Sequence, residues 1–227
     1  MSRPGFFITF EGSEGCGKST QIALLAEKLR RAGREPLLIR EPGGTPAGES
    51  IRHLLQHAPE GENLVPEAEL LLFAASRAQL VREKILPALE AGLIVISDRF
   101  FDSTTVYQGV ARRIPAEDTA QINAFAIGDC LPDVTFVLDL DRKTSLDRMR
   151  KGKRELDRIE RESEEFFAAV RQGYLDLAKK NPARVALLDA SMTVENLSKQ
   201  IEFGLSHHNE TLFSSINSTP HDTGADQ

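Results

Sequence analysis

A chain of 227 residues is long enough to bury a substantial core in one domain, and its 41% hydrophobic and 27% charged residues are ordinary for a soluble globular protein. The net charge of -6 argues against extended nucleic-acid binding, which needs a broad basic surface, although local positive sites for a small anion can exist on an acidic protein. No apolar run approaches the roughly 20 residues of a membrane span, and two cysteines are too few for a disulfide framework, so we expect a protein of the reducing cytoplasm.

Five short runs of apolar, largely β-branched residues predict buried parallel strands. In chain order they cover residues 6–10, 36–39, 93–97, 134–138 and 185–188. Helical patterns occupy residues 18–31, 67–91, 102–110, 116–127, 142–150, 159–179 and 194–205. Pro87 is expected to bend the longest of these helices near its end. Strands that alternate with helices predict an α/β fold with a three-layer arrangement, in which a parallel sheet of about five strands carries helices on both faces.

The last stretch of the chain, residues 207–227, is polar, with scattered Ser, Thr, Asn, Asp, Gly and Pro. Such a composition is typical of a disordered tail. His207 and His208 could bind a metal, but a solvated tail is the favoured interpretation. We therefore expect one domain over residues 1–206, followed by a tail.

Residues 12–19, GSEGCGKS, match the phosphate-binding pattern G-x-x-x-x-G-K-[ST] in full, between a predicted strand and a predicted helix. The glycines let the backbone wrap closely around phosphates, and the helix N-terminus adds its positive dipole end. Lys18 is expected to reach the β- and γ-phosphates and Ser19 to hold Mg²⁺. Cys16 could be a reactive thiol, but a small side chain that fits a tight loop is favoured. The candidate ATP-binding residues are Gly12, Ser13, Glu14, Gly15, Cys16, Gly17, Lys18, Ser19 and Thr20.

The third predicted strand delivers Asp98 at its C-terminal end, which places a carboxylate near the Mg²⁺ shell. Arg99 follows it directly. An arginine here is unusual for a simple ATPase and would suit an additional phosphate, while a structural ion pair with Asp98 is the alternative. The chain contains no Asn-Lys-x-Asp guanine-reading motif, which disfavours a GTPase.

A second basic feature is the run RMRKGKR at residues 148–154. Charge runs are usually solvated helix faces. This run separates two helical patterns and contains a glycine, which also fits a mobile lid over phosphates, near residues 148–158. Phosphoryl transfer needs such charge, because its transition state spreads negative charge over the transferred group.

Together these motifs resemble the thymidylate kinase (dTMP kinase) family. The resemblance rests on FEGSEGCGKST at residues 10–20, REPGGT at residues 40–45, Asp98-Arg99-Phe100 with Ser103, Tyr107 and Gln108, and ELDRIE at residues 155–160. It implies a P-loop fold like that of nucleoside monophosphate kinases, and transfer of the γ-phosphate of ATP to dTMP with Mg²⁺, giving dTDP. Family members are commonly homodimers, so a homodimer is expected. Phe100 departs from the family, which commonly has Tyr or His there.

The resemblance also implies how the acceptor phosphate and sugar are held. Arg52 and Arg99 would clamp the dTMP phosphate. Glu14 would contact the deoxyribose 3′-hydroxyl, and Tyr107 would crowd the 2′ position and so disfavour ribonucleotides. The loop that shapes the acceptor site would contain Pro42 and Gly44, and beside them Glu41 would help to place water and metal.

Base recognition follows from the same resemblance. Phe73 and Arg77 are four residues apart, hence on one helix face, and the family role is for Phe73 to stack on thymine while Arg77 bonds its edge. Thr104 and Gln108 form another such pair, near the base. The candidate dTMP-binding residues are Glu14, Glu41, Pro42, Gly44, Arg52, Phe73, Arg77, Arg99, Ser103, Thr104, Tyr107 and Gln108.

No general base is required, because the dTMP phosphate is already ionised at neutral pH and the enzyme has only to align groups and neutralise charge. Lys18 and Arg99 would do this together with the basic run. Some family members carry a catalytic arginine inside the P-loop, where this chain has Gly15 and Cys16. The resemblance therefore implies that the lid supplies it, as in bacterial-type enzymes. The lid candidates, in order, are Arg154, Lys153 and Arg150.

Two other functions stay open. Another nucleoside monophosphate or deoxynucleoside kinase is the first, and for a nucleoside kinase Glu41 or Asp98 could be the base; the pair Arg52 and Arg99 argues instead for a phosphorylated acceptor. The second is a P-loop switch or partitioning-type ATPase, which would need a partner surface. The loop at residues 41–44 would have no role in such a protein.

Overall fold

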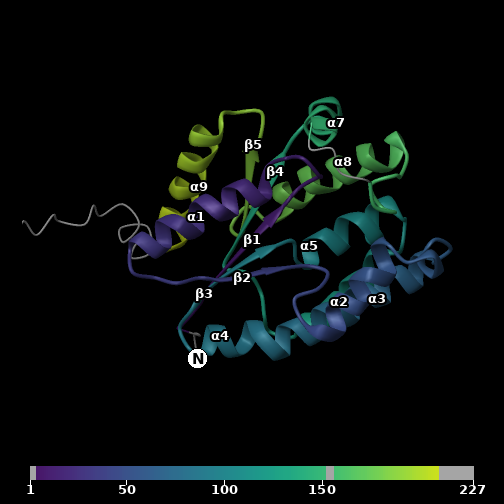
Figure 1. Ribbon diagram of the computed structural model, residues 1–227, viewed down its shortest axis with the longest axis horizontal. Coiled ribbons are helices and arrows are strands. Elements are labelled where there is room, and N and C mark those ends of the chain that lie inside the picture. The colour runs from purple at the N-terminus through teal and green to yellow at the C-terminus, as the bar shows by residue number, and fades with distance from the viewer. Residues whose placement is uncertain (1–3, 152–155, 210–227) are drawn as a thin grey trace, which may run out of the picture.

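A computed structural model describes residues 4–151 and 156–209. Its centre is a five-stranded sheet, parallel throughout, in which the strands follow the order β2-β3-β1-β4-β5 (Figure 1). The strands are β1 (Phe6–Glu11), β2 (Leu37–Arg40), β3 (Ile94–Asp98), β4 (Val134–Asp139) and β5 (Val185–Asp189). Each boundary lies within one residue of its prediction, and the α/β fold with a five-stranded parallel sheet is confirmed.

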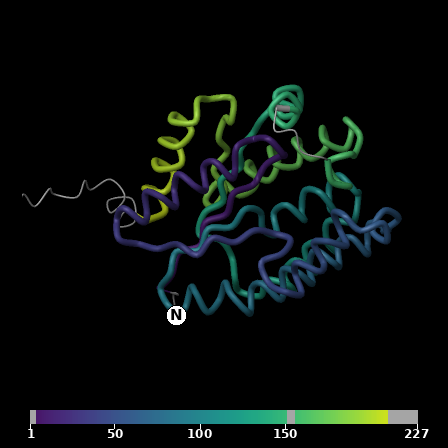
Figure 2. The backbone as a smooth tube through the Cα atoms, viewed as in Figure 1, coloured from purple at the N-terminus to yellow at the C-terminus, as the bar shows by residue number. Residues whose placement is uncertain are grey.

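Helices cover both faces of this sheet (Figures 1 and 2). They are α1 (Lys18–Arg31), α2 (Pro46–Gln56), α3 (Pro66–Leu80), α4 (Leu86–Glu90), α5 (Phe101–Thr104), α6 (Ala116–Ile127), α7 (Arg142–Lys151), α8 (Glu164–Lys180) and α9 (Val194–His208). One short 3-10 turn, Pro59–Gly61, and two π-helical turns, Val81–Ile85 and Thr105–Ala111, complete the regular structure of the described residues.

The alternation of side chains along the strands divides the core between the two faces. On one face, Ile8 and Phe10 of β1 pack with Leu25 of α1 and Ile201 of α9. On the other face, apolar side chains of β1 and β3 pack against the region from α3 to α4, and those of β4 and β5 pack against α8. The molecule is therefore a three-layer sandwich of helices, sheet and helices.

Two elements were absent from the predicted set, namely α2 and the turn Pro59–Gly61. Helix α2 begins at Pro46, and the Oγ1 atom of Thr45 before it accepts a hydrogen bond of 3.0 Å from the backbone N–H of Gly48. A threonine cap followed by proline is a good helix start. Glycines and prolines surround Thr45, and because they are typical of loops the sequence analysis placed no helix here.

Four predicted helices differ from the observed ones. The helix predicted at 102–110 is α-helical only over α5 and continues as the π-helical turn Thr105–Ala111. The helix predicted at 67–91 is interrupted by the π-helical turn, where the Leu86 N–H bonds the Val81 carbonyl five residues back, next to Pro87, which has no N–H to donate. Helix α8 begins five residues late, after Ser163 caps it, and α9 continues to His208, three residues beyond its predicted end. The division into a domain and a tail remains a prediction.

Within residues 4–151 and 156–209, no helix is both long and apolar enough to cross a membrane. The same residues contain no group of three or more His, Cys, Asp and Glu side chains that could hold a metal ion by themselves.

Candidate active site

A cavity of about 750 Å³ opens at the carboxyl ends of the strands. Strands β1 and β4 are neighbours, and the chain leaves β1 toward β2 on one side of the sheet but leaves β4 toward β5 on the other. Ligands of open α/β folds bind in the crevice at such a point. The P-loop, the loop after β2, the end of α5 and part of α7 all contribute to the lining.

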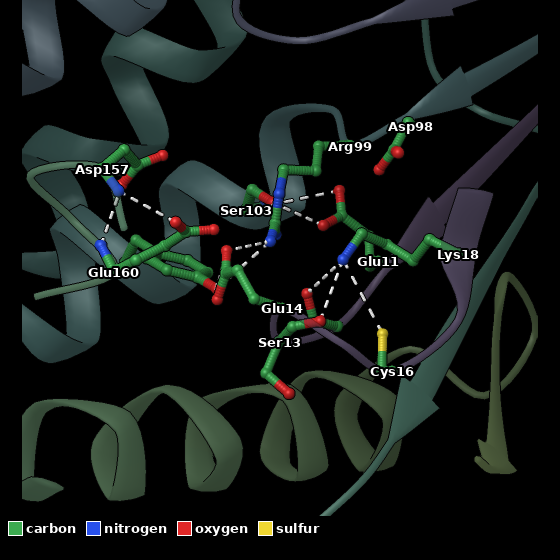
Figure 3. Close-up of polar contacts among 12 residues, drawn as sticks. Glu11, Ser13, Glu14, Cys16, Lys18, Asp98, Arg99, Ser103, Asp157 and Glu160 are labelled. Carbon is green, nitrogen blue, oxygen red and sulfur yellow. Dashed lines mark hydrogen bonds and ion pairs between the residues drawn. The ribbon is translucent and has the colours of Figure 1, made fainter. Parts of the chain in front are cut away.

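The P-loop begins at the end of β1 and runs into α1. Gly12 has a φ of 130°, and a Cβ atom there would lie 2.5 Å from the Leu138 carbonyl oxygen, so a side chain would not fit. Lys18 turns its Nζ back into the loop, 3.0 Å from the carbonyl oxygens of Gly12 and Ser13 (Figure 3). Cys16 is fully buried and packs in the core, as expected of a small side chain in a tight loop.

The first residues of α1 meet the end of β3. The Ser19 hydroxyl donates a hydrogen bond of 3.2 Å to the Asp98 carboxylate. A hydroxyl and a carboxylate suit Mg²⁺, which keeps several waters and is commonly held by one or two carboxylates plus the phosphates of a substrate. Ser19 and Asp98 therefore fit the metal that the sequence predicted for them.

Arg99 forms the centre of a cluster that we call the Arg99 cluster, made of Glu14, Arg99, Ser103 and Tyr107. Figure 3 shows Glu14, Arg99 and Ser103 of this cluster. The Arg99 guanidinium lies 2.5 Å from the Glu14 carboxylate, 3.0 Å from the Ser103 hydroxyl and 3.4 Å from the Tyr107 hydroxyl. Burial would raise the pKa of Glu14, but the charges of Arg99 and Lys18 outweigh it and lower that pKa. Arg99 thus pairs with Glu14 of the P-loop, which links the phosphate cradle to the predicted acceptor side.

Glu11 and Tyr174, to which the sequence analysis gives no site role, support the Arg99 cluster. Glu11, at the end of β1, is fully buried and accepts hydrogen bonds from the Phe100 N–H (2.8 Å), the Ser103 hydroxyl (2.5 Å) and the Tyr174 hydroxyl (2.9 Å). Burial, with a contribution from nearby Asp102, raises the pKa of Glu11. Glu11 and Tyr174 thereby hold the backbone after Arg99, whose φ of 73° lies in the left-handed region.

The loop after β2 contains Glu41, joined to Pro42 by a cis peptide bond. The buried Glu41 carboxylate accepts a hydrogen bond of 2.7 Å from Arg77, which also bonds the Asn123 side-chain oxygen and the Phe100 carbonyl oxygen, each at 3.3 Å. Burial raises the pKa of Glu41 to about 7, against the lowering effect of Arg77. With its guanidinium occupied in this way, Arg77 is 1% exposed and lies behind the cavity wall.

The cavity is lined by four residues that the sequence analysis assigns to the acceptor site, namely Arg52, Phe73, Thr104 and Gln108. Arg52 donates to the Pro42 carbonyl oxygen at 2.9 Å, and burial lowers its pKa. The candidate residues outside the lining, among those described, are Gly12, Ser13, Gly44, Arg77 and Arg150. Gly44 instead donates its N–H to the Glu49 carboxylate at 2.7 Å.

Four side chains of the lining carry a buried oxygen without a partner in the described structure: Gln21, Glu41, Gln56 and Thr104. Buried polar atoms are almost always hydrogen-bonded, to protein, to ordered water or to a ligand. Their concentration around one cavity marks it as a place where water or a polar ligand completes the hydrogen bonding.

The basic run is only partly described, because Lys153 and Arg154 lie outside the described residues. Arg150 is exposed and pairs with Asp147 at 3.8 Å. Arg148, which carried no prediction of its own, lines the cavity and donates to the carbonyl oxygens of Ala190 (3.0 Å) and Gly15 (3.4 Å). Within the described part of the run, Arg148 therefore contacts the P-loop and Arg150 is exposed to solvent.

The chain re-enters the cavity wall at residues 157–160, which we call the lid-end segment. Asp157 and Glu160 both line the cavity and cap one another, each accepting a hydrogen bond of 2.9–3.0 Å from the other's backbone N–H (Figure 3). This stretch belongs to the ELDRIE motif, but the sequence analysis assigns no site role to it.

Phe100, the departure from the family pattern, is fully buried and packs edge-on against Phe7 with ring centroids 5.0 Å apart.

Comparisons with known proteins agree with this geometry. The family model described as thymidylate kinase matches residues 10–201. The thymidylate kinase of Kosmotoga olearia is 48% identical over 195 residues, covering 86% of this chain and 92% of the relative, and that of Symbiobacterium thermophilum is 52% identical over 196 residues, covering 86% and 90%. The crystal structure of thymidylate kinase from Ehrlichia chaffeensis superposes with a TM-score of 0.72 at 36% identity, covering 88% of this chain and 98% of that chain.

Proposed function

The chain belongs to the thymidylate kinase family, and from that premise we propose that it transfers the γ-phosphate of ATP to dTMP, giving dTDP and ADP. The observation that carries this proposal is the Arg99 cluster, in which a partly buried arginine, paired with a P-loop carboxylate, faces the same cavity as Lys18. A donor phosphate in the P-loop and an acceptor phosphate at Arg99 would then share one cavity.

The acceptor roles of the individual residues follow from this arrangement. Arg99 and Arg52 would hold the dTMP phosphate, and Glu14, already within reach of the Tyr107 hydroxyl at 3.3 Å, would receive the 3′-hydroxyl of the sugar. The acceptor phosphate is ionised at neutral pH, so positioning and charge neutralisation supply the catalysis without a general base. Phe73, Thr104 and Gln108 would contact the base.

Magnesium is proposed as the metal of the reaction. Ser19 and Asp98 would hold it, and when bound it would neutralise charge on the donor phosphates. Lys18 and the backbone N–H groups of the loop would bind the same phosphates from the protein side. Glu41, close to the acceptor loop, would orient water near them.

A lid arginine would provide the remaining charge, with Arg154, Lys153 and Arg150 as candidates in that order. We expect the variant of the responsible residue to lose at least about 10³-fold in kcat, the lower end of the effect of arginines that act on transferring phosphates. Arg154→Ala and Arg150→Ala should be assayed side by side, with Arg148→Ala as a third arm. Unchanged kcat in Arg154→Ala and Arg150→Ala would move the catalytic charge elsewhere.

A cytoplasmic homodimer is the proposed state of the enzyme. Within the described residues neither Cys16 nor Cys130 forms a disulfide, as suits a reducing compartment. Helices α3 and α6 carry large exposed apolar side chains, Leu71 at 56% and Phe125 at 83%, of the kind that interfaces cover. Light scattering of the purified protein should give twice the 25.1 kDa chain mass, and a monomer would contradict the proposal.

The activity is tested by supplying ATP, Mg²⁺ and each nucleoside monophosphate in turn, and measuring ADP formation. We expect dTMP to raise the rate far above that with water alone and above that with dCMP, dAMP or dGMP. A better acceptor among the other monophosphates would indicate a related kinase. ADP formation that no acceptor stimulates would favour a P-loop switch ATPase.

A further inference from the structure

Glu69, on α3, carries a buried carboxylate with three partners from distant parts of the chain. It accepts hydrogen bonds from the Gln108 side-chain amide at 2.8 Å, from Arg112 at 3.2 Å and from Arg158 at 2.5 Å, and it is 1% exposed. We propose that Glu69 is a positioning residue that ties the base end of the acceptor pocket to the lid-end segment. The inference rests on the proposed function and adds a link between its two substrates.

The first arm of this link fixes the orientation of Gln108. Although burial opposes it, hydrogen bonds from Gln108, Arg112 and Arg158 lower the pKa of Glu69, so the group is a carboxylate at neutral pH and can only accept. Gln108 must therefore turn its Nε2 toward Glu69. Its Oε1 is then the hydrogen-bonding atom left for a ligand in the cavity that Gln108 lines.

The second arm holds the lid-end segment. Arg158 lies at its centre, with a side chain 9% exposed, and donates to the Leu55 carbonyl oxygen at 2.9 Å as well as to Glu69. Its neighbours Asp157 and Ile159 line the cavity. Arg158 therefore anchors the cavity-lining residues on both sides of it to the C-terminal end of α2 and to α3.

Loss of Glu69 would affect the two arginines unequally. Arg112 has a second carboxylate partner, Glu162 at 2.6 Å, and lies 4.8 Å from the centre of the Phe166 ring. Within the described residues, the ion pair of Arg158 is with Glu69. A nearly buried arginine without a counter-charge is strongly destabilising. Arg158 and the lid-end segment would therefore lose their position before Arg112 does.

The consequence is a coupling between the two substrates. If the lid-end segment becomes ordered when a nucleotide occupies the donor side, its contact with Glu69 also orders Gln108, and bound ATP then tightens dTMP binding. By linkage, dTMP must tighten ATP binding by the same factor. The quantity to measure is the ratio of the dTMP dissociation constants without and with a saturating non-hydrolysable ATP analogue. Coupling of this kind typically amounts to about 5- to 150-fold.

The test compares Glu69→Gln with a matched control, Glu62→Gln. Glu62 binds Arg161, only three residues beyond Arg158, at 2.6 Å in a half-exposed ion pair. Calorimetric titration of dTMP with and without AMP-PNP should give a ratio above about 5 for the wild type and for Glu62→Gln, and a ratio near one for Glu69→Gln. The KM for dTMP should also rise about 10-fold or more in Glu69→Gln alone.

A second variant guards against a misfolded Glu69→Gln. Arg158→Gln removes the lid arm and leaves the contacts of Glu69 with Gln108 and Arg112, so it should lose the coupling while its affinity for dTMP alone stays within about twofold. Equal ratios in the wild type and a folded Glu69→Gln, or in the wild type and Arg158→Gln, would overturn the link, as would a wild-type ratio of one. A wild type that does not bind dTMP at all would instead contradict the proposed function.

Discussion

Replacing Lys18 by alanine is expected to lower kcat by at least about 10²–10³-fold, the usual effect of removing one preorganised group that stabilises transition-state charge. Lys18 is buried to 8% exposure within the P-loop, and its Nζ is held at 3.0 Å by the carbonyl oxygens of Gly12 and Ser13. The ammonium is thus placed where the β- and γ-phosphates are proposed to bind, before any nucleotide arrives. No other cation in the described part of the loop could replace it.

The fold should survive this change. The alanine variant loses hydrogen bonds to two carbonyl groups, each worth about 1 kcal/mol, while the strands and the core around Cys16 are unaltered. Turnover measured through ADP release and thermal unfolding measured by circular dichroism separate the two effects. Lys28→Ala is the matched control on the same helix, since Lys28 pairs with Glu202 away from the cavity, and its kcat should be unchanged. Normal turnover in Lys18→Ala would contradict the role given to the P-loop.

The sequence predicted the sheet well, because its central strands β1, β3 and β4 are buried on both faces and appear as short apolar runs such as residues 134–138. It also predicted the P-loop, whose chemistry is contained in eight consecutive residues. The helix α2 was missed for a local reason, since Gly43, Gly44 and Pro46 obscure the cap at Thr45.

The supporting residues of the site were missed for another reason, which is distance along the chain. Tyr174 reaches Glu11 across 163 residues, and Arg158 reaches Glu69 across 89. Neither pairing leaves a periodic or local signal. Arg148 is different, because residues two apart on a helix are rotated by about 200° and so point to nearly opposite sides. Helical phase could therefore have separated Arg148 from Arg150 on sequence grounds.

The second large effect is expected at Arg99, which we propose to replace by lysine. The guanidinium reaches Glu14, Ser103, Tyr174 and Tyr107 at 2.5–3.4 Å at the same time, and its centre lies 5.2 Å from the centre of the Tyr107 ring. A lysine keeps the charge but offers one compact ammonium in place of a planar fork, so it cannot hold this geometry. The value of kcat/KM for dTMP should fall about 10²-fold or more.

The substitution should weaken the use of the acceptor dTMP and leave the binding of the donor nucleotide unchanged. Arg99 contacts Glu14 through its side chain, whereas the P-loop backbone and Lys18 are proposed to hold the donor phosphates, so the affinity for AMP-PNP alone should stay within about twofold. Arg171→Lys is the control, because Arg171 also forms a bidentate ion pair, with Asp139 at 2.7 and 2.8 Å, and neither residue lines the cavity. If Arg99→Lys kept the wild-type kcat/KM for dTMP, positive charge alone would suffice at this position. The planar clamp would then have no part in holding the acceptor phosphate.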